Sequence, residues 1–182
     1  MPEMLNQLMR DHRNLASLLD LVERQVDGFA TGGTLDFELF DSILDYVLHY
    51  PDLYHHPRED LIFRRLQERD PAARAAVAAM LAEHDRLQQV DRAFAGVIRN
   101  IEREAELPRS WFLDTARTFI KETRAHMELE ESDLFPHAQR CLTEADWQEL
   151  DAALIAPSDP LFAGTVEERY RALHERIMQL GA

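Results

Sequence analysis

The sequence predicts an all-α protein, an up-down-up-down four-helix bundle with extra C-terminal helices. Three observations support this prediction. Apolar residues recur in steps of three and four along four long segments. The 182 residues include only six glycines and eight prolines, which favours helices over a sandwich or barrel. No stretch alternates with the period of two that marks a competing β-strand. Short loops between consecutive helices favour antiparallel neighbours.

The first predicted helix covers roughly residues 4–26. Leu8 and Leu15 belong to its apolar stripe, and His12 occupies the step between them. We therefore expect His12 to face the core, where an imidazole is costly without a partner. Glycines then mark a loop, and Thr34 or Asp36 is a candidate cap for the next helix.

The second segment covers roughly residues 35–68 and contains Pro51 and Pro57. Proline inside a helix removes a backbone donor and clashes with the preceding turn. We therefore expect a kink near Pro51 and a second irregularity near Pro57, between His55 and Glu59.

The third segment begins at Pro71, capped by Asp70, and runs to about residue 104. His84 lies in its apolar stripe, three residues from Leu81 and from Leu87. Four residues after His84 stands Gln88, which is neither a histidine nor a carboxylate.

The fourth segment starts near Pro108 and is expected to stop at Pro136, with His126 and Glu130 on its inward face. Beyond it, Thr143 is the expected cap of a helix through about residue 154, and residues 157–164 form a loop. Thr165 and Glu168 then open a last helix to Leu180 as a capping box. We expect residues 1–140 to form the bundle and residues 141–182 a helical extension packed on it.

Composition limits the function. The net charge of −14 has the wrong sign for binding nucleic acid or an anionic membrane surface, so we expect neither as a partner. No apolar run approaches the roughly 20 residues that span a bilayer, and no signal peptide is evident, so a cytoplasmic protein is expected. Cys141 is the single cysteine, which rules out an internal disulfide and thiolate-rich metal sites.

A histidine followed four residues later by a glutamate occurs twice, as His55 with Glu59 and as His126 with Glu130. On a helix this spacing places both side chains on one face, roughly 5–6 Å apart at Cβ, so each pair forms half of a metal site. His56, with Asp60 four residues later, is an alternative to His55.

Together with one inward histidine on each of the other two segments, the pairs predict six ligands from four helices: His12, His55, Glu59, His84, His126 and Glu130. Imidazole with carboxylate suits iron, manganese or zinc, and two carboxylates able to bridge suit two ions better than one. Glu131 and Asp60 are candidate acceptors for ligand imidazoles. His49, His137 and His174 are interpreted as structural or packing residues, and Cys141 has no basic partner nearby in sequence that suggests a nucleophile.

This pattern resembles the hemerythrin-like, or HHE cation-binding, family. The resemblance covers about residues 4–140 and includes the Leu134-Phe135-Pro136 run that follows Glu130. It implies a bundle holding a non-heme di-iron centre with bridging carboxylates and terminal histidines. Oxygen-carrying members have a second histidine on the third helix, whereas this chain has Gln88. The resemblance then leaves one metal short of a terminal ligand, a place that water, His56 or Tyr54 could take.

The resemblance and the ligand set together predict a di-iron protein that binds or senses O2, NO or peroxide. Zinc or manganese could replace the two iron ions in a purified sample. The alternatives are a di-iron enzyme with catalase-like or oxidase activity, and a protein whose interactions respond to iron. A histidine-rich centre favours ligand binding over hydrocarbon oxidation, so a binding protein is preferred to an enzyme.

Overall fold

The computed structural model describes residues 2–103, 108–153, 159–162 and 166–180. Within these ranges every regular element is a helix. The elements are α1 (Glu3–Ala30), α2 (Phe37–Val47), the π-helix η1 (Pro51–His55), α3 (His56–Arg69), the 3₁₀ turn η2 (Pro71–Ala73), α4 (Arg74–Glu102), α5 (Arg109–Leu129), the π-helix η3 (Glu130–Leu134), α6 (Phe135–Cys141), α7 (Glu144–Ala152), the 3₁₀ turn η4 (Glu168–Tyr170) and α8 (Arg171–Leu180).

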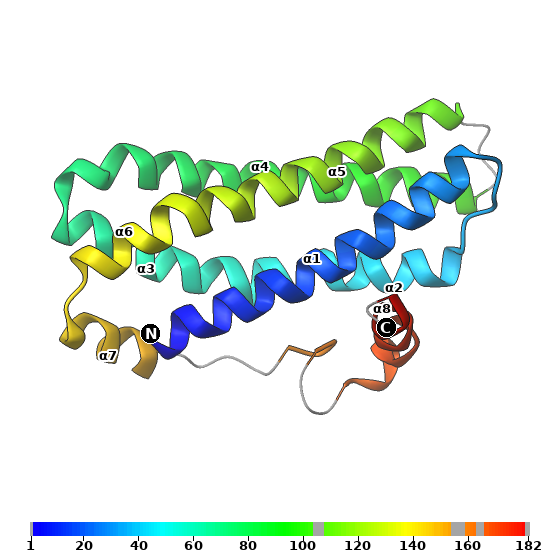
Figure 1. Cartoon of the computed structure of the whole chain (residues 1–182). Coiled ribbons are helices and arrows are strands. Elements are labelled where there is room, and N and C mark those ends of the chain that lie inside the picture. The colour runs from blue at the N-terminus through cyan, green and yellow to red at the C-terminus, as the bar shows by residue number, and fades with distance from the viewer. Residues whose placement is uncertain (1, 104–107, 154–158, 163–165, 181–182) are drawn as a thin grey trace.

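Four long segments run antiparallel to one another along the chain and form the bundle (Figure 1). α1 packs beside α5 and α3, and α4 packs beside α5, α2 and α3. The all-α bundle with additional C-terminal helices is therefore confirmed. α3 and α6 also contact each other, so the second and fourth segments meet at one end of the bundle.

Asp36 and Asp70 cap the helices that follow them. The Asp36 carboxylate accepts a hydrogen bond from the Leu39 N–H at the start of α2. The Asp70 carboxylate accepts one from the Ala72 N–H, and Pro71 occupies the first turn after it. Both acids satisfy backbone donors that have no partner inside the helix.

The backbone around Pro57 differs from the sequence-based prediction. The second irregularity was expected between His55 and Glu59, but η1 ends at His55 and α3 runs without a break from His56, with Pro57 in its first turn. Proline is tolerated there because the missing donor has no helical partner.

The fourth segment was expected to stop at Pro136, and this was wrong. α5 passes into η3 at Glu130, and α6 then continues to Cys141 with Pro136 in its first turn. The helix around Glu130 is therefore also irregular, although it was expected to be uninterrupted. In each case the π-helix precedes an X-Pro pair and lets the chain continue helically past a residue that lacks a donor.

The apolar core consists of two clusters separated along α1. Leu8 and its neighbours pack with Phe63 and Phe135 at one end, while Leu18 and the residues after it pack with Phe40 toward the other end. His12 lies between these stretches of α1. The bundle therefore places its polar centre between two apolar layers.

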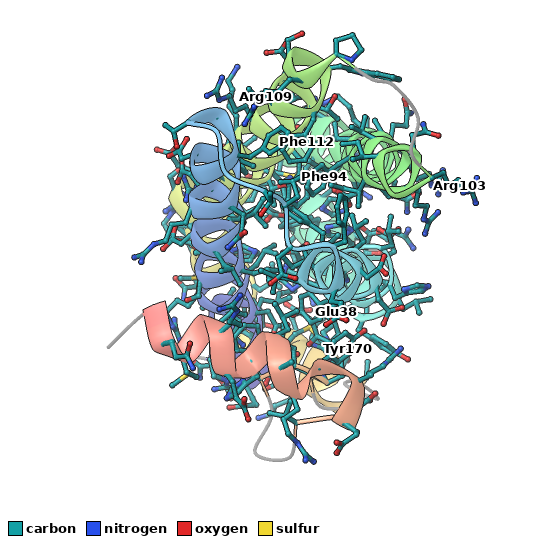
Figure 2. All side chains as sticks on the ribbon, turned by 90° about the vertical axis from the view of Figure 1, so that its right-hand side faces the viewer. Glu38, Phe94, Arg103, Arg109, Phe112 and Tyr170 are labelled. Carbon is teal, nitrogen blue, oxygen red and sulfur yellow. The ribbon has the colours of Figure 1, made fainter. Side chains whose placement is uncertain are left out.

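An aromatic group fills the second cluster. The Phe40 ring makes edge contacts with Phe94 and with Phe112, with 6.0 Å between ring centroids in each pair, and all three side chains are buried. Figure 2, which looks along the bundle, shows Phe94 and Phe112 between the helices. Aromatic packing thus fills the core at this end of the bundle.

Polar contacts attach the C-terminal helices to the bundle. Thr143 caps α7 as expected and forms a capping box with Asp146, whose carboxylate also accepts hydrogen bonds from Arg65 and Arg69 of α3. The Tyr170 hydroxyl, labelled in Figure 2, donates to Asp45 at 2.6 Å, beside the contact of α8 with α2.

The division of the chain at residue 140 stays a prediction, with α6 ending at Cys141. Thr165, half of the capping box expected at the last helix, lies outside the described residues, as does half of the 157–164 loop. None of the described helices combines the length and apolarity needed to cross a bilayer.

Replacing Phe40 by alanine is expected to lower the free energy of unfolding by about 3–5 kcal/mol, because a buried aromatic ring leaves a cavity between two others. Urea unfolding of the two chains measures this change. Met178→Ala, at a side chain that is 59% exposed, is the control and should change stability by less than about 0.5 kcal/mol. A Phe40→Ala chain as stable as the parent would contradict the packing described.

Candidate metal centre

The six predicted ligand residues converge in the middle of the bundle, and each is at most 6% exposed. Every long segment contributes at least one of them. They are His12 on α1, His55 at the end of η1, Glu59 on α3, His84 on α4, His126 on α5 and Glu130 at the start of η3.

One group of candidate ligand atoms comprises His12, His55 and Glu59. The Nε2 atoms of His12 and His55 are 3.1 Å apart. Glu59 Oε1 lies 3.0 Å from His55 Nε2 and 3.3 Å from His12 Nε2. These three atoms therefore lie close enough together to be candidate ligands of one ion.

A second group comprises His56, His84, His126 and again Glu59. The other oxygen of Glu59, Oε2, lies 3.5 Å from His84 Nε2. The His56 ring stacks on His84, with centroids 4.4 Å apart and planes inclined by 13°. Glu59 thus offers one oxygen to each group.

Glu130 extends across both groups as well. Its Oε2 lies 3.3 Å from His126 Nε2 and 3.4 Å from His12 Nε2, and its Oε1 lies 3.5 Å from His84 Nε2. Like Glu59, it has no exposed surface. Two buried carboxylates therefore connect the two sets of histidines.

His55 and His56 fall in different groups of candidate ligand atoms, His55 with His12 and His56 with His84 and His126. Gln88 stands where the resemblance led us to look for a second histidine. Its Oε1 instead accepts a hydrogen bond from Arg92 Nη2 at 3.1 Å. His56, rather than a second residue of α4, stands over His84.

Carboxylates orient the rings from outside. The Nδ1–H of His12 donates to Glu131 at 2.9 Å, that of His84 to Asp60 at 3.1 Å, and that of His55 to Asp11 at 3.3 Å. A proton held at Nδ1 leaves the Nε2 lone pair directed inward, as in metal sites where an outer carboxylate supports a ligand histidine.

Sequence reasoning found Asp60 and Glu131 but missed Asp11. The Asp11 carboxylate is 3% exposed and also accepts hydrogen bonds from Gln7, Tyr50 and Arg58. Its position three residues after Leu8 places it on the inward face of α1, and this was the available signal. Asp52 Oδ1, at 3.4 Å from His56 Nδ1, is too distant for a good hydrogen bond.

Several buried atoms of the centre have no hydrogen-bond partner in the described part of the chain. They are Glu59 Oε2, His84 Nε2, both ring nitrogens of His126 and both carboxylate oxygens of Glu130. An unsatisfied buried polar atom costs roughly 1–3 kcal/mol. The imidazole Nε2 atoms and carboxylate oxygens among them face one another, and such a set of lone pairs fits bound cations.

Without a cation, protons must balance the two carboxylates. Burial opposes a charge on His84, but the hydrogen bond to Asp60 and the nearby carboxylates of Glu130 and Glu59 outweigh it and raise its pKa to about 10. Burial likewise opposes charge on His55, and Glu59 and Asp11 raise its pKa to about 9. For His126 burial dominates and lowers the pKa to about 4. A metal ion would have to displace the protons on His55 and His84.

A small internal cavity of about 20 Å³ adjoins the histidines. Its walls include His55, His56 and His126, together with apolar side chains such as Leu87. Asp91, also in the wall, is 8% exposed. Burial, assisted by the charge of Asp52 and opposed by Arg92, raises the pKa of Asp91 to about 8. The cavity therefore contains a carboxyl group that is largely protonated at neutral pH.

Asp91 was not among the residues selected from the sequence. It lies seven residues after His84, two helical turns along the inward face of α4, where an acid is expected only with a reason to be buried. That position was the signal that could have identified it.

The comparisons with known proteins agree with this geometry. The model of the Hemerythrin HHE cation binding domain matches residues 3–138. The match covers α1 through most of α6 and includes every histidine and glutamate of the two groups. No curated protein and no solved structure matches the chain.

Asp91→Asn is expected to change how the stability of the metal-free chain depends on pH. An acid whose folded pKa is about 8 binds more protons when folded than when unfolded between about pH 4 and pH 8, so stability falls as pH rises through that window. The variant should be more stable than the parent at pH 8, by roughly 2–5 kcal/mol, and similar to it at pH 4.

Urea unfolding at pH values between 4 and 8 measures this difference, and Asp85→Asn, at an exposed residue of the same helix, is the control. Parallel pH profiles for the parent and Asp91→Asn would show that the Asp91 carboxyl is not held neutral by burial.

Proposed function

The chain belongs to the hemerythrin HHE cation-binding domain family, and from this premise we propose that it is a non-heme di-iron protein that binds O2, NO or peroxide. One observation carries the proposal: Glu59 presents one oxygen to His12 and His55 and the other to His84. A buried carboxylate facing two sets of imidazoles suits a pair of ions better than a single ion.

In this proposal His12 and His55 hold one ion, and His56, His84 and His126 hold the other. Glu59 and Glu130 would each contribute to both ions. His56 would supply the donor that Gln88 does not, giving five protein donors around the second ion and four around the first.

The donor set favours iron. Nitrogen and oxygen donors without sulfur suit iron, zinc or manganese. Five protein donors around one ion exceed the tetrahedral set that zinc prefers in closed sites. Zinc or manganese can still occupy the centre in a purified sample.

When bound, a ferrous pair supplies electrons and open positions for a small ligand. The chain's own residues do the rest. Asp11, Asp60 and Glu131 hold three imidazoles with their Nε2 atoms inward. The cavity of about 20 Å³ suits one water-sized molecule.

Asp91 favours a second candidate function, the turnover of peroxide. A carboxyl group with a pKa of about 8 can both donate and accept a proton near neutral pH. Because it lines the same cavity as three of the histidines, it can deliver a proton to an oxygen atom of a ligand held there.

The parent chain is expected to bind two iron ions after anaerobic ferrous loading and gel filtration. Glu59→Gln should lose both ions, because the amide offers only one oxygen, and His56→Ala should retain about one. Elemental analysis measures the content, with His49→Ala, at a surface histidine bonded to the Asp45 carbonyl, as control. A parent chain with one ion, or a His56→Ala chain with two, would contradict the assignment.

Filling the cavity is expected to block small ligands without removing the metal. Leu87→Phe adds a ring at the cavity wall and should weaken NO binding to the ferrous chain, and azide binding to the ferric chain, by about tenfold or more, while overpacking costs roughly 1–3 kcal/mol of stability. Absorption spectra during titration measure both affinities. Leu53→Phe, on the exposed side of η1, is the matched control. Unchanged affinities in Leu87→Phe at full iron content would place the ligand elsewhere.

A further inference from the structure

The continuation of α6 past Pro136 creates a second cluster of metal-binding side chains. Because the helix runs to Cys141, His137 and Cys141 are four residues apart on one helix and share a face. If the helix ended at Pro136, as the sequence-based prediction had it, these two side chains would not share a helix face.

Packing of α6 against α3 brings a third residue to this face. Asp70 ends α3, and its Oδ2 accepts a hydrogen bond from His137 Nε2 at 2.9 Å. Its other oxygen is held by the Ala72 N–H at 2.9 Å, so the carboxylate is fixed in orientation. The candidate ligand atoms of Asp70, His137 and Cys141 all lie within 4.8 Å of one another.

We propose that Asp70, His137 and Cys141 form a surface binding site for one divalent ion of borderline softness, of which Zn²⁺ is the representative. The site is separate from the buried centre and goes beyond the proposed function. All three residues are partly exposed, so an ion can reach them from solvent and a water molecule can complete its coordination.

The chemistry of the three donors selects the ion. A thiolate with an imidazole and one carboxylate suits Zn²⁺ or Co²⁺, whereas Mg²⁺ and Ca²⁺ prefer oxygen donors only. Bonds of about 2.0–2.3 Å place the ligand atoms of a tetrahedral zinc site roughly 3.3–3.8 Å apart. The observed cluster needs only small side-chain rotations to reach that spacing.

The Asp70 carboxylate is suited to binding a cation. The hydrogen bonds from Ala72 and His137 lower the pKa of Asp70, so this carboxylate is anionic at neutral pH. An ion bound here would join the start of the α3–α4 connection to α6. Since α6 follows η3 without a break, the site fastens the segment that carries Glu130.

Co²⁺ gives a direct test, because its charge-transfer absorption in the near ultraviolet reports thiolate ligation and Cys141 is the only cysteine of the chain. The whole chain, with its buried centre already loaded with iron, is titrated with Co²⁺ under anaerobic conditions in a non-thiol reductant. We expect a thiolate band that saturates at one Co²⁺ per chain and is removed by Zn²⁺. Gel filtration should show no change in oligomeric state.

Variants at each of the three residues test its contribution to Co²⁺ binding. Cys141→Ser should abolish the band, and His137→Gln should weaken Co²⁺ binding by roughly tenfold or more, since even loss of an outer-shell partner has that effect. Asp70→Asn keeps the cap of η2 but loses the anionic donor, and should also weaken binding. His49→Ala, at a surface histidine away from the cluster, should bind Co²⁺ like the parent.

Two results would overturn the proposal. One is the absence of a thiolate band at stoichiometric Co²⁺ in chains whose free thiol is confirmed by titration, which would leave only the hydrogen bond between His137 and Asp70. The other is a band that persists unchanged in both His137→Gln and Asp70→Asn, which would mean adventitious binding by the thiol alone.

Discussion

The burial of two carboxylates is the constraint on which the structure depends. Glu59 and Glu130 have no exposed surface, and no arginine or lysine reaches them in the described part of the chain. Ionised groups in an apolar interior need counter-charges, because isolated burial costs far more than a fold can supply. Histidines from all four segments surround them, and the apolar clusters on either side keep water away. The bundle is thus arranged to hold positive charge at its middle.

The π-helices adjust the backbone at this centre. η1 ends on His55 and η3 begins on Glu130, so both irregular turns lie at proposed ligands. A π-helix changes the angular position of the residues that follow it, and such turns are frequent at functional sites. In this chain His55 and His56, at the junction of η1 and α3, fall in different groups of candidate ligand atoms. Continued helix after each proline then preserves the packing of α3 against α6.

Much of this arrangement could be predicted from the sequence. The 3.6-residue period located the helices, and the repeated spacing of His55 with Glu59 and of His126 with Glu130 selected side chains that do meet. The π-helices could not be predicted, because Pro57 was interpreted as an irregularity and Pro136 as the end of a helix. Both instead occupy the first turn of a helix that continues past them. Asp11 and Asp91 were missed since a single buried acid has no repeating pattern. The joint placement of His55 and His56 depends on backbone geometry that spacing alone does not specify.

Anomalous diffraction at the iron edge from crystals of the iron-loaded chain tests the central claim most directly. We expect two iron peaks per chain, one beside His12 and His55 and the other beside His56, His84 and His126, with the Glu59 carboxylate between them. A single peak, or two peaks of which only one contacts Glu59, would contradict the account of a shared, bridging carboxylate.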